Sequence, residues 1–166
     1  MPLAINMSLS TNDGAHNGSS LLEQYISTVS ATQRVTIVIA AGNEGEAAHH
    51  VGGTLEDINE VYFNISSDES IVVINLYKSL LPDVSIELLC PGGFSTGEII
   101  LKEGFNEGTI GNSRYSIYLT GPKPFDVSGE IGIMLTGINE FVSPGQWKIT
   151  LRKVNEYDGK FDMWLP

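Results

Sequence analysis

Two continuous apolar runs, separated by a stretch with helical spacing, constrain the fold of this chain more than any other feature. Residues 2–9 (PLAINMSL) and 35–41 (VTIVIAA) have the composition of parallel strands that are buried on both faces. Between them, Ser20 and Glu23 have the spacing of a capping box, which predicts a helix from Ser20 to about residue 31. The apolar residues of that helix fall on one face: Leu21, Leu22, Tyr25, Ile26 and Val29.

The sequence therefore predicts a right-handed strand-helix-strand unit of an α/β fold. Two strands and one helix cannot close a core, so we expect half of this domain to be missing from the chain. The first apolar run begins almost at Met1, which is typical of a chain that starts inside a fold. Because exposed apolar strands are unstable in water, we expect the isolated chain to form a homodimer through them.

From about Gly53 the pattern changes to short strands separated by turn residues such as Pro82-Asp83 and Pro144-Gly145. Many short strands without helical periodicity predict an antiparallel β-sandwich. We therefore divide the chain into residues 1–52 and residues 53–166. The expected strands of the second part are residues 60–66, 70–78, 83–90, 98–101, 114–120, 129–136, 146–154 and 160–165.

Composition excludes several classes of function. The chain has 9 basic and 20 acidic residues and a net charge of −11, whereas nucleic-acid binding needs clustered Lys and Arg. No stretch is apolar for the length of a membrane span, so we expect neither a nucleic-acid nor a membrane partner. The single cysteine, Cys90, excludes an intrachain disulfide and lies in an apolar run, where a buried structural thiol is expected.

Two short segments of the first part resemble the subtilisin-like serine proteases, or subtilases. Residues 5–10 (INMSLS) are similar to the I-N-[ML]-S-L-G segment of that family, and residues 40–45 (AAGNEG) match its A-A-G-N-E-G segment. The two segments occur in the family order and are separated by a helix of suitable length. The resemblance implies the part of a subtilisin-like catalytic domain that lies between the catalytic His and Ser, and it implies no cofactor.

The resemblance also assigns the candidate site. Asn43 would donate its side-chain amide to the oxyanion that forms on the scissile carbonyl of a polypeptide substrate. The segment from Ser8 to Ser10 would pair with the substrate backbone as an added strand, and Gly42 would leave room for the substrate. Ser10 stands where the family has glycine. The substrate-binding residues implied in this way are Ser8, Leu9, Ser10, Ala41 and Gly42.

The family's catalytic triad is absent from the sequence, so we expect the chain to be inactive alone. Residues 93–97 match G-x-S-x-G, the nucleophile elbow of α/β-hydrolases, but that motif must follow a buried parallel strand and open a helix. Here Pro91-Gly92 precedes the motif and a strand-like stretch follows it. We therefore expect Ser95 to lie in a hairpin loop.

The histidines and aromatic residues offer weaker signals. His16, His49 and His50 are the three histidines, and His49-His50 follows the predicted oxyanion segment. Adjacent side chains of an extended chain point in opposite directions, and no carboxylate spacing completes a metal site, so we predict a contact between the two parts and no metal site. The cluster of Trp147, Phe161 and Trp164 is expected to pack in the core and not to form a carbohydrate platform.

A narrower resemblance covers the whole chain. The β-rich block after AAGNEG, the His-His junction and the closing residues 159–166 (GKFDMWLP) are similar to the germination-specific proteases of clostridia. Those enzymes carry a jelly-roll domain inserted between the oxyanion asparagine and the catalytic serine, and related enzymes process the precursor of a spore-cortex hydrolase. The resemblance implies a fragment of a bacterial serine endopeptidase, which is spore-associated or secreted.

Two other functions stay open from sequence. The parent protein could be a pseudoprotease or binding protein whose β-sandwich recognises a ligand or partner. Alternatively, the sandwich could serve mainly to rigidify the protease body.

Overall fold

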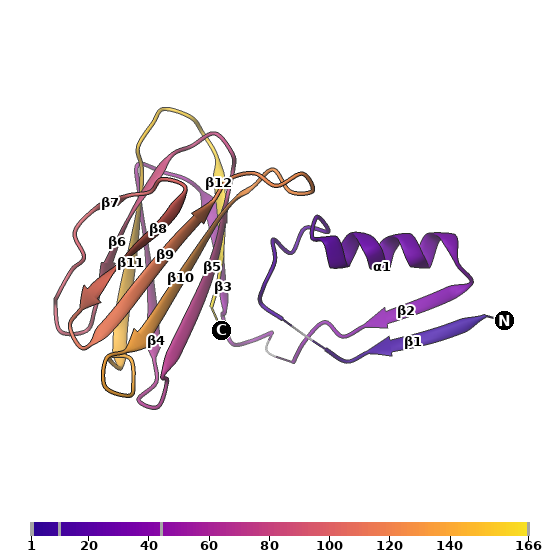
Figure 1. Ribbon diagram of the computed structural model, residues 1–166, viewed down its shortest axis with the longest axis horizontal. Helices are drawn as coiled ribbons and strands as arrows, with labels where there is room; N and C mark the ends of the chain where they lie inside the picture. Colours follow the sequence, from indigo (N-terminus) through magenta and orange to yellow (C-terminus); the bar gives the residue numbers. More distant parts are fainter. Residues whose placement is uncertain (1, 10, 44, 166) are drawn as a thin grey trace.

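The computed structural model describes residues 2–9, 11–43 and 45–165. Figure 1 shows two parts, a small strand-helix-strand unit and a larger β-sandwich beside it. In the first part, β1 (Leu3–Met7) and β2 (Val35–Ile39) form a two-stranded parallel sheet, and α1 (Leu21–Thr32) packs on β2. The predicted order and both strands are therefore confirmed.

The start of α1 is also as predicted. Ser20 is the N-cap: its hydroxyl accepts a hydrogen bond from the Glu23 amide, and the Glu23 carboxylate accepts one from the Ser20 amide. The pKa of the Glu23 carboxyl group is lowered by the Ser20 side chain and by hydrogen bonds from the Ser20 and Gly18 amides. Because the cap satisfies amide groups that have no partner within the helix, it fixes where the helix begins.

The expectation that the strands of this unit are buried on both faces is wrong. Leu3, Val38 and Ile39 are at least half exposed, with 52%, 56% and 50% of their surface accessible. A single helix covers one face of a two-stranded sheet, and the other face has no covering layer among the described residues. Only part of the predicted apolar face of the helix is buried. Ile26 and Val29 are partly buried, whereas Leu21, Leu22 and Tyr25 are exposed.

The second part is an antiparallel β-sandwich, as predicted. One sheet has six strands, which are in spatial order β3 (His50–Thr54), β12 (Lys160–Trp164), β5 (Ile71–Lys78), β10 (Gly129–Gly137), β9 (Ser113–Thr120) and β8 (Gly104–Ile110). The other sheet has four strands, in the order β4 (Ile58–Ile65), β11 (Gly145–Lys153), β6 (Val84–Leu89) and β7 (Ile99–Ile100).

Two strands of the sandwich, β3 and β8, were missed from sequence. Each contains two glycines, which weaken the strand signal. Both are edge strands of the six-stranded sheet, held by pairing with β12 and β9 respectively. The predicted boundary between residues 52 and 53 falls inside β3.

The hydrophobic core lies between the two sheets. Its centre combines alternate residues of β11 and β10, all fully buried: Trp147, Ile149, Leu151, Ile131, Ile133 and Leu135. This confirms the inward face predicted for residues 147, 149 and 151. Cys90 is 3% exposed and belongs to the same core, which confirms it as a buried structural thiol.

Candidate functional site

The carboxyl ends of β1 and β2 lie side by side. The two strands are parallel and in register, with Met7 opposite Ile39, and the Ala40 amide donates a hydrogen bond to the Met7 carbonyl oxygen over 3.1 Å. The segments that follow the strands therefore leave the sheet at the same edge (Figure 1). We call this the substrate edge; its described residues are Ser8, Leu9, Ala41, Gly42 and Asn43.

The residues of the substrate edge are all exposed. Leu9 has 72% of its surface accessible, and the Ser8 hydroxyl accepts a hydrogen bond of 2.9 Å from the side-chain amide of Asn6. Ser10, the last residue of the predicted substrate-binding segment, lies outside the described residues. An exposed strand end of this kind offers backbone groups to an added strand.

Asn43 follows β2 after a tight change of direction. Gly42 has a φ of +90°, a left-handed conformation that favours glycine, and a Cβ at this position would meet no atom within 4 Å. Asn43 is exposed, and its side chain makes no hydrogen bond to another described residue. The edge thus combines an unused amide donor, open space at Gly42 and a neighbouring strand end.

The G-x-S-x-G motif is not a nucleophile elbow. Ser95 lies in the loop between β6 and β7, and a strand follows the motif where the elbow requires a helix. The Ser95 hydroxyl donates to the Glu87 carboxylate over 2.7 Å and accepts from the Gly97 amide over 2.8 Å. The first of these bonds lowers the pKa of Glu87, and the loop predicted for Ser95 is confirmed.

The junction between the two parts is built around Trp164, the last residue of β12. Trp147 and Phe161 are buried in the core as predicted, but Trp164 is only half-buried, and its prediction as a core residue is wrong. Its ring stacks with the rings of His16 and His50, at centroid distances of 4.5 and 4.8 Å. Side chains alternate along β12, so the buried Phe161 and Met163 place Trp164 on the outer face, where the two histidine rings pack against it.

His50 and His49 both take part in this junction. The His50 ring lies 3.0 Å from the Asp162 carboxylate, and the His49 carbonyl oxygen accepts a hydrogen bond of 2.8 Å from the Leu165 amide. Since β3 belongs to the six-stranded sheet, these two contacts lie along the pairing of β3 with β12, and the contact between the two parts is the stack of His16 on Trp164. Within the described residues, His, Cys, Asp and Glu side chains form no group of three or more that could hold a metal ion.

The buried Tyr77 contacts Trp164, and its ionisation provides a test of the packing at the junction. Its ring meets the Trp164 ring edge-on at 5.8 Å and the residue is 8% exposed, so burial, followed by the carboxylates of Glu130 and Asp13, raises the pKa of Tyr77 above its usual value of 10.0. Because the unfolded tyrosine ionises first, the stabilisation from this group is complete below pH 10 and is lost as the pH rises above 10.

We therefore expect the free energy of unfolding of the wild type to fall faster above pH 10 than that of Tyr77→Phe, by up to about 1.4 kcal/mol per pH unit. Urea denaturation at pH 9, 10.5 and 11.5 measures this difference. Tyr157→Phe, at an exposed tyrosine, is the matched control and should follow the wild type. Parallel pH curves for the wild type and Tyr77→Phe would contradict the prediction.

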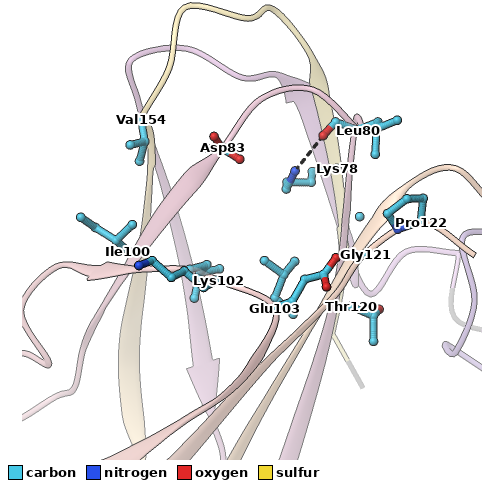
Figure 2. Close-up of a pocket in the computed structure, with 13 residues that line it drawn as sticks. Lys78, Leu80, Asp83, Ile100, Lys102, Glu103, Thr120, Gly121, Pro122 and Val154 are labelled. Carbon is cyan, nitrogen blue, oxygen red and sulfur yellow. Dashed lines mark hydrogen bonds between the residues drawn. The ribbon is translucent and has the colours of Figure 1, made fainter.

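A pocket of about 440 Å³ opens at one end of the sandwich and is lined by residues of both sheets (Figure 2). The buried Lys78 lies in it, and burial lowers the pKa of its ammonium group. That group donates to the carbonyl oxygens of Pro82, Ser79 and Leu80, at 2.6, 3.2 and 3.5 Å, so it holds the connection between β5 and β6.

A scan against models of protein families gave no match, and neither did a search of curated proteins. A search of solved structures confirms the recognition made from sequence: the chain corresponds to a segment of a subtilisin-like germination protease. The matching structure is that of the Clostridium perfringens CspB protease, with a TM-score of 0.93 and 47% sequence identity. The match covers 99% of this chain and 36% of that protease.

The described residues contain no helix with the length and apolar character needed to cross a membrane.

Proposed function

We propose that this chain is part of a bacterial subtilisin-like serine endopeptidase, to which it supplies the oxyanion hole and one side of the substrate cleft. One observation carries the proposal. The parallel pairing of β1 and β2 brings Ser8, Leu9 and the segment 41–43 to a single exposed edge, in a chain that is 47% identical to a segment of the CspB protease.

The chemistry follows from that edge. A polypeptide substrate would lie along residues 8–10 as an added strand, and its scissile carbonyl would face Asn43. Attack by a serine builds negative charge on the carbonyl oxygen, and the Asn43 amide would donate a hydrogen bond to that oxygen. The left-handed Gly42, with open space where a Cβ would lie, lets the substrate approach the donor.

The nucleophile and its base would come from other parts of the protease, so the chain alone should be inactive. A fluorophosphonate probe, which labels activated serines, is expected to leave the isolated chain unlabelled and to label the full-length protein at a serine outside these residues. Stoichiometric labelling of Ser95 or of any other serine of this chain would refute the proposal. If the full-length protein stays unlabelled, the alternative of a pseudoprotease or binding protein holds, with the pocket of Figure 2 as the first place to look for a ligand.

The resemblance supports two further parts of the proposal. We infer a jelly-roll type of sandwich, because early strands pair with late ones, β4 with β11 and β5 with β10. We also infer a spore-related context, and an isolated chain that dimerises through the exposed apolar residues of β1 and β2.

A further inference from the structure

We propose that Trp164 is a positioning residue: through its stack with His16 and His50, the sandwich fixes the two halves of the substrate edge relative to each other. This inference rests on the proposed function of that edge. It assigns to the end of β12 a role in substrate binding, although Trp164 itself is remote in sequence from every residue of the edge.

The first half of the edge is held through the segment that follows it. Residues 11–20, which we call the anchor segment, continue directly from residues 8–10. The Asn12 side-chain amide donates to the Leu165 carbonyl oxygen over 2.9 Å, and the Asn12 carbonyl oxygen accepts from the Asn75 side-chain amide over 3.2 Å. Further along, the Ser19 hydroxyl donates to the carboxylate of Asp126, in the loop between β9 and β10, over 2.9 Å. The anchor segment is thus attached to the outer side of the six-stranded sheet.

The second half of the edge is held by Trp164 and Leu165, which also contact the anchor segment. After Asn43, the chain enters β3 at His50, which is the direct cross-strand neighbour of Trp164. The Leu165 amide bonds the His49 carbonyl oxygen, while the Leu165 carbonyl oxygen accepts from Asn12. Trp164 and Leu165 therefore contact the segments that follow both strands of the edge.

The backbone of His16 supports the importance of the stack. His16 has a φ of +51°, which is uncommon for a residue other than glycine, and its ring lies within 12° of parallel to the Trp164 ring. A backbone in this conformation persists only where the surroundings hold it. Here the conformation places the His16 ring against the Trp164 ring.

The connections between the stack and the edge are short. His16 lies eight positions after Ser8, and His50 lies seven positions after Asn43. A misplacement of about 1 Å at a catalytic site can cost about 10²-fold in rate, so loosening the stack should lower the rate at which a substrate on the edge reacts.

The first test uses hydrogen exchange on the 166-residue chain. Trp164→Leu should speed amide exchange in the anchor segment and in residues 45–49 by at least about tenfold, while β10 keeps its protection. Trp164→Phe retains a flat ring and should stay close to the wild type. Phe105→Leu, which removes an exposed aromatic ring from β8 at the opposite edge of the six-stranded sheet, is the matched control and should change neither segment. Unchanged exchange in both segments, or exchange that rises equally throughout the sandwich, overturns the proposal.

The second test measures hydrolysis of a fluorogenic peptide amide by the full-length protein. Trp164→Leu should lower kcat/KM by about tenfold, through KM because residues 8–9 lose their position and through kcat because Asn43 does, and Trp164→Phe should restore most of it. A Trp164→Leu enzyme with wild-type kcat/KM overturns the positioning role, even if Asn43→Ala abolishes activity. If Asn43→Ala has no effect, the proposed function fails instead, and the exchange experiment still decides whether Trp164 orders the two segments.

Discussion

Replacing Asn43 by alanine in the full-length protein is expected to lower kcat by about 10²–10³ with little change in KM. The size of this effect is taken from subtilisin, where removing one oxyanion donor has this consequence. The donor acts on charge that exists only in the transition state, so its loss slows the chemical step and leaves substrate binding nearly unchanged.

The structure makes this experiment easy to interpret. Asn43 is exposed, and its side chain bonds no other described residue, so Asn43→Ala should leave the free energy of unfolding within about 0.5 kcal/mol of the wild type. Asn64→Ala, at an exposed asparagine on β4, is the matched control and should keep wild-type kcat. A fall in kcat of less than about fivefold for Asn43→Ala would argue against an oxyanion role.

Replacing Trp147 by alanine is expected to destabilise the sandwich by about 3–5 kcal/mol. Trp147 is fully buried between the sheets, and its indole N–H donates to the Ser143 carbonyl oxygen over 2.8 Å. The substitution removes a large apolar group, leaves a cavity and deprives the Ser143 carbonyl oxygen of its side-chain donor. Urea denaturation followed by circular dichroism measures the loss.

Tyr62→Ala provides the control for this stability measurement. Tyr62 is also aromatic and lies on the four-stranded sheet, but 55% of its surface is accessible, so its loss should cost far less than that of Trp147. Equal effects of the two substitutions would mean that the core does not lie where the sheets enclose Trp147.

Structural features that depend on residues close together in the sequence could be predicted, whereas features that depend on distant strands could not. The helix cap at Ser20 and Glu23 and the alternation through Trp147, Ile149 and Leu151 are local patterns, and the structure confirms both. The edge strands β3 and β8 carry no such pattern, because their glycines suppress it and their neighbours supply the pairing.

The candidate site also has a part that could be predicted from the sequence and a part that could not. The short motifs around Ser8 and Asn43 could be found from sequence, and the parallel strands bring them to one edge, although their roles stay predictions. The partnership of Trp164 with His16 could not be found, because it joins opposite ends of the chain and depends on tertiary packing. Burial of β1 and β2 was overestimated, since composition does not reveal how many covering layers a strand receives.

The pairing of β3 with β12 has a practical consequence for engineering. His50, where the chain enters the sandwich, and Trp164, where it leaves, are cross-strand neighbours, and adjacent strands lie only about 4.8 Å apart. In the longer protease proposed above, the whole sandwich could therefore be excised and replaced by a turn of a few residues without stretching the polypeptide on either side. The same attachment point would accept an unrelated domain whose own termini lie equally close together.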